Sequence, residues 1–364
     1  MSHKSKSLKQ LALQKFKKDF WGVFSLYFIG LVGLISVFAY VVAPDNSQHA
    51  NQMHLAIHSK KPGFEVTMLT IPSQIKVKQN VFDKIFFGKK NTDTEIPISG
   101  FEVENDHLVY KEYASNGIEG AEKSIKLSAF PNESLGAFIK ERTFLFGTDK
   151  YGRDLLSRVL VGARISFFIG FVAVFISLVI GILMGSLAGY FGGKVDAIIM
   201  WVINVTWSIP TLLLVIAITL ALGKGFWQVF IAVGLTMWVE VARVVRGQII
   251  SVKEMQYVTA ARALGYNDFR IITKHILPNI MAPVIVISAA NFAAAILIES
   301  GLSFLGIGAQ SPMASWGAMI KDHYNYIILG KPYLAIIPGL CIMSLVMAFM
   351  LIGNALRDAL DVKG

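Results

Sequence analysis

The feature that most constrains this chain is a series of long runs that lack Asp, Glu, Lys and Arg altogether. A bilayer core about 30 Å thick takes roughly 20 apolar residues in a helix, and each run is long enough to cross it. A further stretch begins at Gly225, meets its first charge at Glu240 and continues as an amphipathic helix to residue 250. With it, the sequence predicts an all-α membrane protein with six transmembrane helices. The predicted spans are 21–43, 165–191, 197–223, 225–250, 276–298 and 332–356.

Composition agrees with this class. Of the 364 residues, 54% are hydrophobic and only 16% are charged, whereas ordinary soluble domains carry roughly 25% charged residues. The polar residues are concentrated in a few stretches, which excludes a cytosolic globular enzyme and a disordered protein. The single cysteine, Cys341, lies in an apolar run and offers neither a disulfide nor a zinc cluster.

Small residues and prolines mark positions inside the predicted spans. Gly181, Gly185 and Gly189 repeat every four residues, so one face of that helix can approach another helix closely, most simply within the same chain. The first span is longer than a signal-peptide core and lacks a small-x-small cleavage site, so we expect an uncleaved anchor. Three prolines are expected to kink their helices: Pro210, Pro283 and Pro338.

The distribution of basic residues predicts the orientation. Residues 1–20 are rich in lysine, and the loop 251–278 with its flanks is rich in arginine and lysine. Basic residues favour the cytoplasmic side, so the N-terminus and this loop are predicted to be cytoplasmic, and with six spans the tail 357–364 is predicted to be cytoplasmic as well. The net charge of +10 therefore orients the chain in a lipid bilayer and does not indicate a nucleic-acid partner.

Residues 44–142 lie between the first two spans and are predicted to be extracytoplasmic. Residues 64–71 and 98–110 partly alternate between apolar and polar, which predicts short strands in a small β-rich insert. His49, His54 and His58 cluster near its start, and the last two are four residues apart. This spacing could hold a metal ion on one helix face, but no Cys or carboxylate cluster accompanies it, and a solvated segment explains it equally.

The sequence lacks two motifs that are typical of catalytic sites. The Gly-Lys pairs are not followed by Ser or Thr as a phosphate-binding loop requires. The serine-nucleophile pattern fails because Gly301-Leu302-Ser303-Phe304 continues with Leu305 in place of Gly. We therefore expect a chain that is not an enzyme and holds no cofactor of its own.

The strongest local signal is the predicted cytoplasmic stretch 257–278, which indicates two short helices. Gly265 is a helix stop and Asn267 is a cap for the second helix. Phe269, Ile272 and Ile276 are then expected to share one helix face. Such a helix–turn–helix suits docking into a groove of a partner protein, although an amphipathic helix lying on lipid headgroups would look similar.

At these residues the sequence resembles the EAA loop of bacterial ABC-importer permeases. Ala260, Ala261, Gly265 and Pro278 match the pattern, while Thr259 stands at the position of its Glu. Three further segments resemble the second-permease subunit of the oligopeptide/dipeptide/nickel branch: 146–158, 301–317 and 354–360. The resemblance covers the first span and nearly everything from residue 143 onward, and it leaves the insert 44–142 unexplained.

The resemblance implies the type I permease fold of ABC importers, with a permease core over residues 143–356. It also implies a second homologous permease, two cytoplasmic ATP-binding-cassette ATPases that carry ATP and Mg, and an extracytoplasmic substrate-binding protein. Oligopeptides or dipeptides are the substrates it suggests first. The loop that couples to the ATPases would comprise Tyr257, Val258, Thr259, Ala260, Ala261, Arg262, Ala263, Leu264, Gly265, Tyr266, Asp268, Phe269 and Pro278.

Other interpretations stay open from the sequence. The same kind of permease could import nickel or another small solute, and an ion-coupled secondary transporter or a membrane-anchored sensory protein are alternatives of a different class. Glu299, at the outer end of the fifth predicted span, and Ser303 are candidates for a gate or for a structural role.

Overall fold

The computed structural model describes residues 8–73, 77–90, 93–114, 120–131, 135–223 and 225–361. The first seven residues of the predicted basic N-terminus and the last three of the predicted tail lie outside this description. The chain divides into two compact units. One comprises residues 1–33, 166–310 and 340–364, and the other comprises residues 34–165 and 311–339.

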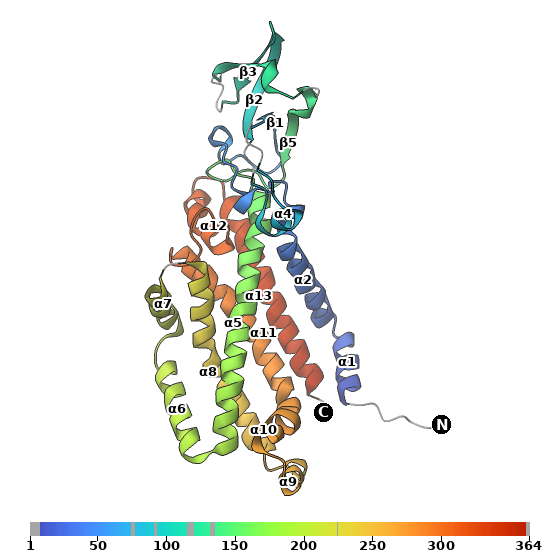
Figure 1. The fold of residues 1–364 in the computed structure, drawn as a ribbon, viewed down its shortest axis with the longest axis vertical. Coiled ribbons are helices and arrows are strands. Elements are labelled where there is room, and N and C mark those ends of the chain that lie inside the picture. Colours follow the sequence, from blue (N-terminus) through green and yellow to red (C-terminus); the bar gives the residue numbers. More distant parts are fainter. Residues whose placement is uncertain are drawn as a thin grey trace, which may run out of the picture. The chain divides into compact units, whose positions relative to one another are not determined.

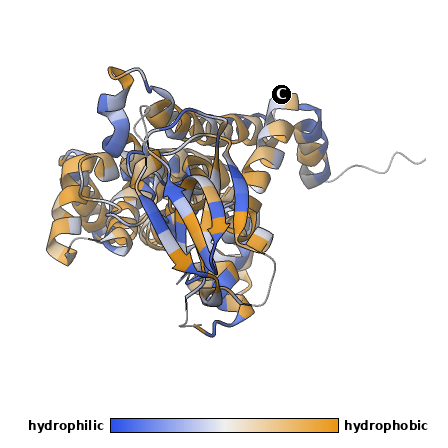
Figure 2. Ribbon diagram, turned by 90° about the horizontal axis from the view of Figure 1, so that it is seen from above, coloured by the Kyte–Doolittle hydropathy of each residue, from blue (hydrophilic) through white to orange (hydrophobic). Residues whose placement is uncertain are grey.

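The first unit is built from apolar helices (Figures 1 and 2). Helices α8 and α11 pack against each other, and α6 and α7 both contact α8. Helices α2, α5 and α13 contribute residues to both units. The helices with residues in this unit are α1 (Leu8–Lys18), α2 (Phe20–Val37), α5 (Leu155–Phe191), α6 (Gly193–Trp207), α7 (Thr211–Leu222), α8 (Phe226–Val252), α9 (Gln256–Ala263), α10 (Asp268–Arg270), α11 (Leu277–Phe304) and α13 (Tyr333–Leu360).

The predicted span 197–223 is wrong as a single helix. It is divided into α6 and α7, which are bent by 92° at the break. Pro210 precedes the first residue of α7, and a proline has no N–H to continue the preceding helix. Among the described residues, five helices are long and apolar enough to cross a membrane, or six if the bent pair counts as one span.

Several other helix bounds also differ from the apolar runs. Helix α5 begins at Leu155, ten residues before the predicted start. Helix α11 ends at Phe304, so Glu299 lies inside it, and α13 continues through Arg357 to Leu360. The first predicted span is divided into α2 and the short α3 (Ala39–Val42). The reason is that a charged residue ends an uncharged run but does not end a helix.

The glycine stripe of α5 packs against α8 of the same chain. A Cβ atom on Gly185 would lie 2.5 Å from the carbonyl oxygen of Ala242, and one on Gly189 would lie 2.9 Å from the carbonyl oxygen of Arg246. On the other side of this contact, a Cβ on Gly234 of α8 would meet Ile176 at 2.7 Å. The two backbones therefore approach more closely than any larger residue permits.

The second unit contains an antiparallel sheet with the strand order β4-β3-β2-β1-β5. Buried apolar side chains of the strands and of the chain after β4 pack into one cluster, which includes Leu69, Leu108 and Phe130. Strands at 64–71 and around 98–110 were expected, and β1 to β3 lie there. The unit contains β1 (Phe64–Ile71), β2 (Thr94–Glu104), β3 (His107–Glu112), β4 (Glu122–Lys126), β5 (Ile139–Phe144), α4 (Val81–Phe87) and α12 (Trp316–His323).

The α5–α8 contact leads to a prediction about stability. Gly185→Ala places a methyl group against the backbone of Ala242, and overpacking of this kind costs about 1–3 kcal/mol. We expect a lower thermal midpoint for the purified protein in detergent. Gly247→Ala on α8 is the matched control, because a Cβ there meets nothing within 4 Å. Equal midpoints for the two variants would contradict the close approach.

Candidate functional site

The loop between α8 and α11 forms the two short helices that its sequence predicts (Figure 1). Gly265 follows α9 with a φ of +76°, a conformation that glycine adopts at little cost. The Asn267 side chain caps α10 by accepting a hydrogen bond from the Arg270 N–H at 2.9 Å. The predicted stop and cap are therefore both present in the structure.

The loop is fastened to the end of α5 through Tyr190. The Tyr190 hydroxyl donates a hydrogen bond of 2.6 Å to Asp268 Oδ1. The Arg262 guanidinium lies 5.8 Å from the centre of the same ring, and its interaction with the Tyr190 hydroxyl raises the pKa of Arg262. Next to this contact, the Tyr266 ring stacks on the His275 ring, with 5.6 Å between the ring centres. The guanidinium carbon of Arg270 lies 4.0 Å from the centre of the same Tyr266 ring.

The expected face of Phe269, Ile272 and Ile276 is not formed. Phe269 is 76% exposed, whereas Ile271 and Ile276 are fully buried. Residues Ile271–Ile276 form a π-helical turn, in which hydrogen bonds join residues five apart. That spacing brings Ile271 and Ile276 to the buried face, where an α-helix would have placed Ile272 with Ile276.

The remaining loop residues divide into a buried and an exposed set. Val258 and Ala261 are buried in a cluster with Val245, Ile249 and Ile280. The alanines therefore do not form one common exposed face. Pro278 lies in the first turn of α11, and Tyr266 is half-buried. The exposed members are Tyr257, Thr259, Ala260, Arg262, Ala263, Leu264, Gly265, Asp268, Phe269 and Pro278.

Glu299 and Ser303 lie together inside α11, and both are buried. Ser303 Oγ donates a hydrogen bond of 2.7 Å to Glu299 Oε1 and accepts one of 3.0 Å from the N–H of Ala309. Glu299 Oε2 lies 3.4 Å from the hydroxyl of Ser166 on α5. The carboxylate thus joins α11 to α5 directly and to the chain after α11 through Ser303.

The histidines near residue 50 do not form a metal centre in the structure. Within the described ranges, no group of three or more His, Cys, Asp and Glu side chains is arranged to hold a metal ion. His54 is buried beside Glu95, with 4.0 Å between Nε2 and Oε2. Burial lowers the pKa of His54 to about 4.

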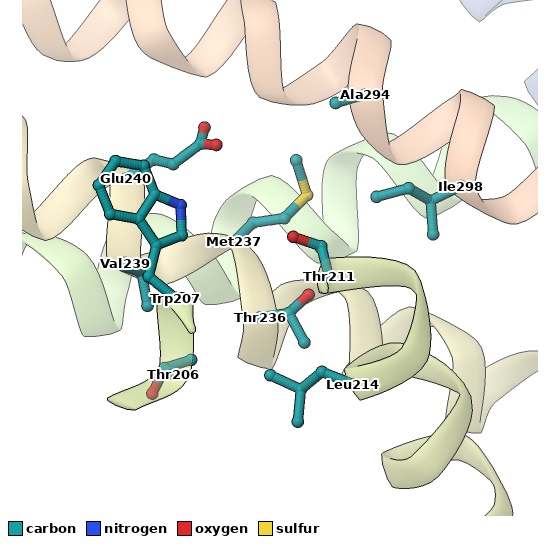
Figure 3. Close-up of a pocket in the computed structure, with 10 residues that line it drawn as sticks. All are labelled: Thr206, Trp207, Thr211, Leu214, Thr236, Met237, Val239, Glu240, Ala294 and Ile298. Carbon is teal, nitrogen blue, oxygen red and sulfur yellow. The ribbon is translucent and has the colours of Figure 1, made fainter. Parts of the chain in front are cut away.

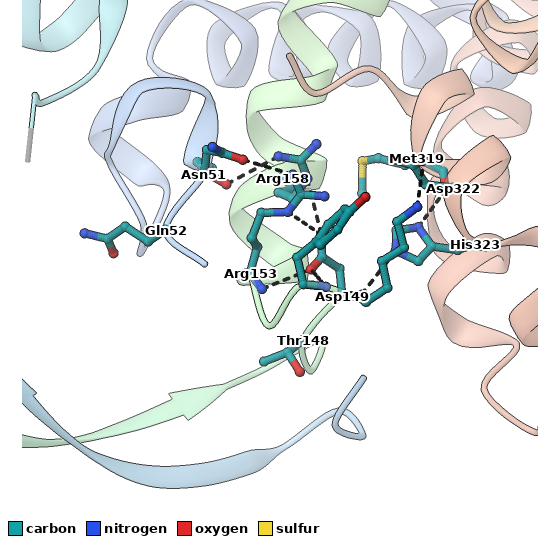
Figure 4. Close-up of polar contacts among 12 residues, drawn as sticks. Asn51, Gln52, Thr148, Asp149, Arg153, Arg158, Met319, Asp322 and His323 are labelled. Carbon is teal, nitrogen blue, oxygen red and sulfur yellow. Dashed lines mark hydrogen bonds and ion pairs between the residues drawn. The ribbon is translucent and has the colours of Figure 1, made fainter. Parts of the chain in front are cut away.

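A buried ionic network in the second unit was not found from the sequence (Figure 4). Asp149 is fully buried and accepts hydrogen bonds from Arg153 Nε at 2.6 Å and from the N–H of Tyr151 at 2.8 Å. Arg158 Nε lies 3.7 Å from the same carboxylate. Arg153 also donates to Asn51 Oδ1 at 2.9 Å, so the network joins the turn 147–154 to the segment around residue 50.

The same turn contacts α12 and depends on a glycine. Lys150 Nζ donates to Asp322 Oδ1 at 3.0 Å, and although burial disfavours its charge, this bond raises the pKa of Lys150. Gly152 has a φ of +74°, and a Cβ there would collide with the carbonyl of His54. The acidic and basic residues that lie close together in 149–158 were the available signal, because buried charges of opposite sign tend to be paired.

The other feature that the sequence did not reveal is a cavity at the α6–α7 break, lined in part by Glu240 (Figure 3). In the sequence, Glu240 is distinguished only as the first charged residue of a predicted span. The bend that exposes it to a cavity depends on tertiary structure.

Comparison with known proteins shows the family to which this chain is similar. Residues 161–363 match the model of the family described as binding-protein-dependent transport system inner membrane component. The chain is 44% identical over 218 residues to the dipeptide transport system permease protein DppC of Bacillus subtilis (strain 168). This alignment covers 60% of this chain and 68% of that protein. It is 43% identical over 218 residues to the oligopeptide transport system permease protein OppC of Escherichia coli (strain K12), with 60% and 72% covered.

A third relative is the glutathione transport system permease protein GsiD of Pectobacterium atrosepticum, which is 41% identical over 217 residues, 60% of this chain and 72% of that protein. Among solved structures, the inward-facing MetNI methionine ABC transporter aligns with a TM-score of 0.47 and 17% identity, over 57% of this chain and 97% of that one. The family model matches more than half of this chain, and the chain covers more than two thirds of these curated relatives. The protein therefore belongs to the family of inner membrane components of binding-protein-dependent transport systems, and it is a multi-pass membrane protein.

Proposed function

We propose that this chain is one of the two permeases of an ATP-driven importer of oligopeptides or dipeptides. The observation that carries the proposal is the family membership together with relatives that are named for dipeptide and oligopeptide transport. In this assignment a second permease completes the pore, two ATPases hydrolyse ATP, and a binding protein delivers the peptide. The chain itself performs no catalysis.

The proposed topology has six spans, with α6 and α7 together acting as one. The basic N-terminus and the loop 251–278 are then cytoplasmic, which agrees with the excess of Lys and Arg in these segments. The even number of spans places the C-terminal tail on the same side. Residues 44–142, including the sheet, are extracytoplasmic.

The loop 251–278 is the proposed contact with the ATPases. Val258 and Ala261 are buried among side chains of α5, α8 and α11, and Asp268 is bonded to Tyr190 of α5. A pull on α9 is therefore transmitted to three helices through packed contacts rather than through a flexible tether. Closure of the ATPase pair would move these helices as a rigid group.

The exposed residues of the loop give the docking surface its character. Leu264 is 72% exposed and Phe269 is 76% exposed, one on each side of Gly265. Exposed apolar groups of this size mark interaction sites on proteins. Thr259 keeps its hydroxyl near its own helix, 3.4 Å from the carbonyl oxygen of Met255, so we propose docking by shape and apolar contact.

The first test of this function alters the docking surface without altering the core. Ala260 is exposed on α9, so Ala260→Trp should leave the chain folded and assembled but prevent α9 from seating in the ATPase groove. We expect peptide uptake by reconstituted vesicles to fall at least tenfold and ATP hydrolysis to lose its stimulation by loaded binding protein. Gly265→Pro should act in the same direction, because it also removes the hydrogen bond from the Gly265 N–H to Arg262.

Lys194→Trp is the matched control for this experiment, because Lys194 is exposed at the start of α6. It adds the same bulky ring outside the loop. Wild-type uptake and normal coupling in Ala260→Trp would exclude the loop as the coupling element. A wild-type complex that fails to take up any peptide would contradict the proposed substrate class.

A second test concerns Glu299, which we propose as a gate residue. Glu299→Gln replaces a carboxylate that lies within hydrogen-bond distance of the Ser303 and Ser166 hydroxyls, and hydrogen bonds to charged groups contribute about 1.5–3 kcal/mol each. We expect uptake to fall several-fold while the assembled complex is still isolated in normal yield. Ser303→Ala should have a similar effect, because it also leaves the N–H of Ala309 without its acceptor. Unchanged uptake in both variants would remove the gate assignment.

A further inference from the structure

The bend between α6 and α7 opens a cavity of about 190 Å³ in the first unit (Figure 3). Its walls come from the end of α6, the start of α7 and the facing sides of α8 and α11. The lining residues are Thr206, Trp207, Thr211, Leu214, Thr236, Met237, Val239, Glu240, Ala294 and Ile298. A continuous helix over residues 197–223 would not have left this space.

Glu240 is the one charged side chain in this lining. It lies near the middle of α8 and is exposed. No ion pair within 4.0 Å joins it to another residue in the described ranges. An ionisable group inside a membrane helix is costly and usually marks a substrate or ion pathway, so this carboxylate is a candidate to bind a cation.

The next two cations on α8 each form hydrogen bonds with residues of α6. Arg243 donates to Asn204 Oδ1 at 2.7 Å, and its guanidinium carbon lies 3.5 Å from the centre of the Trp207 ring. Arg246 forms two hydrogen bonds to Asp196, of 2.5 and 2.6 Å. Arg243 thus lies against Trp207, which is a wall of the cavity, and forms no ion pair with Glu240 within 4.0 Å.

The threonine hydroxyls increase the acceptor character of the lining. Thr206 donates its proton to the carbonyl oxygen of Val202 at 2.8 Å, and Thr236 donates to that of Val233 at 2.9 Å. Once these protons are used within the helices, the hydroxyl oxygens act as acceptors. Together with the carboxylate, they favour a ligand group that is cationic and rich in N–H donors.

We propose that this cavity receives the protonated amino terminus of a peptide in transit, with Glu240 as its counter-ion. The inference rests on the proposed peptide-import function and names the part of the substrate that this chain contacts. Every unmodified peptide carries an α-ammonium group whatever its side chains are, and with a pKa of about 7.7–8.0 most of it is protonated at neutral pH. The cavity is smaller than the roughly 300–1,000 Å³ of sites that enclose a whole ligand, which fits the recognition of one end of a peptide.

The experiment measures peptide binding to the complete importer, with both permeases and both ATPases, in lipid nanodiscs without the binding protein. The probes are labelled trialanine and its N-acetylated form, which lacks the ammonium group. We expect wild type to bind trialanine at least about tenfold more tightly than the acetylated peptide. Glu240→Gln should abolish this preference, and Glu240→Asp should retain part of it. Glu102→Gln, on the exposed end of β2, is the control for loss of one negative charge.

Three results would overturn the proposal: a preference that survives in Glu240→Gln, wild-type protein that does not distinguish the two peptides, and loss of the second permease from the Glu240→Gln complex. The last would show that Glu240 pairs with a cation of the partner permease. Uptake assays with the binding protein separate this from failure of the function itself. If wild type imports no peptide, the peptide-import assignment fails; if it imports peptides while Glu240→Gln shows no change in preference, only the amino-terminus site fails.

Discussion

The close contact between α5 and α8 is the interaction on which the helical unit depends. Because glycines at positions 181, 185 and 189 carry no side chain, the α8 backbone approaches until the carbonyl of Ala242 nearly touches α5. Helix α8 in turn forms one wall of the α6–α7 cavity, and it is followed directly by the loop that contains α9. The end of α5 supplies Tyr190, which binds Asp268 in that loop. The proposed coupling element and the proposed peptide site are therefore both attached to the same helix pair.

Several polar side chains of this unit are satisfied by partners within the chain. Arg246 with Asp196, and Glu299 with Ser303, find their partners within the chain, as expected where unpaired polar groups are expensive. Such pairs hold helices together and leave little capacity for a ligand. Glu240 differs, because its carboxylate faces a cavity and forms no ion pair with the described residues. That difference, rather than the mere presence of a charge in a span, is the reason to assign it a role in binding.

The sequence predicted those features that depend on local chemistry. Charge-free runs located the apolar helices, the four-residue glycine spacing indicated the contact face of α5, and Asn267 was recognised as a cap. Features set by tertiary structure were missed or misplaced. The π-helical turn at 271–276 breaks the single helix face that Phe269, Ile272 and Ile276 were expected to share, since a pattern read with an α-helical period cannot register one inserted residue. Some partners of Asp149, such as Arg153, are close to it in the sequence. Asn51, which accepts a hydrogen bond from Arg153, is about a hundred residues away.

The position of Thr259 clarifies what the loop requires. The Thr259 side chain is exposed, and its hydroxyl lies 3.4 Å from the carbonyl oxygen of Met255. No contact in the core therefore depends on the carboxylate that the EAA pattern has at this position. The buried contacts of α9 come from Val258 and Ala261, on either side of it. Fold and attachment of the loop are thus independent of this position, and only the outward surface changes. With Leu264 and Phe269 exposed nearby, that surface has no charge at residue 259 but keeps its apolar area, which is the reason that the proposed docking depends on shape more than on charge.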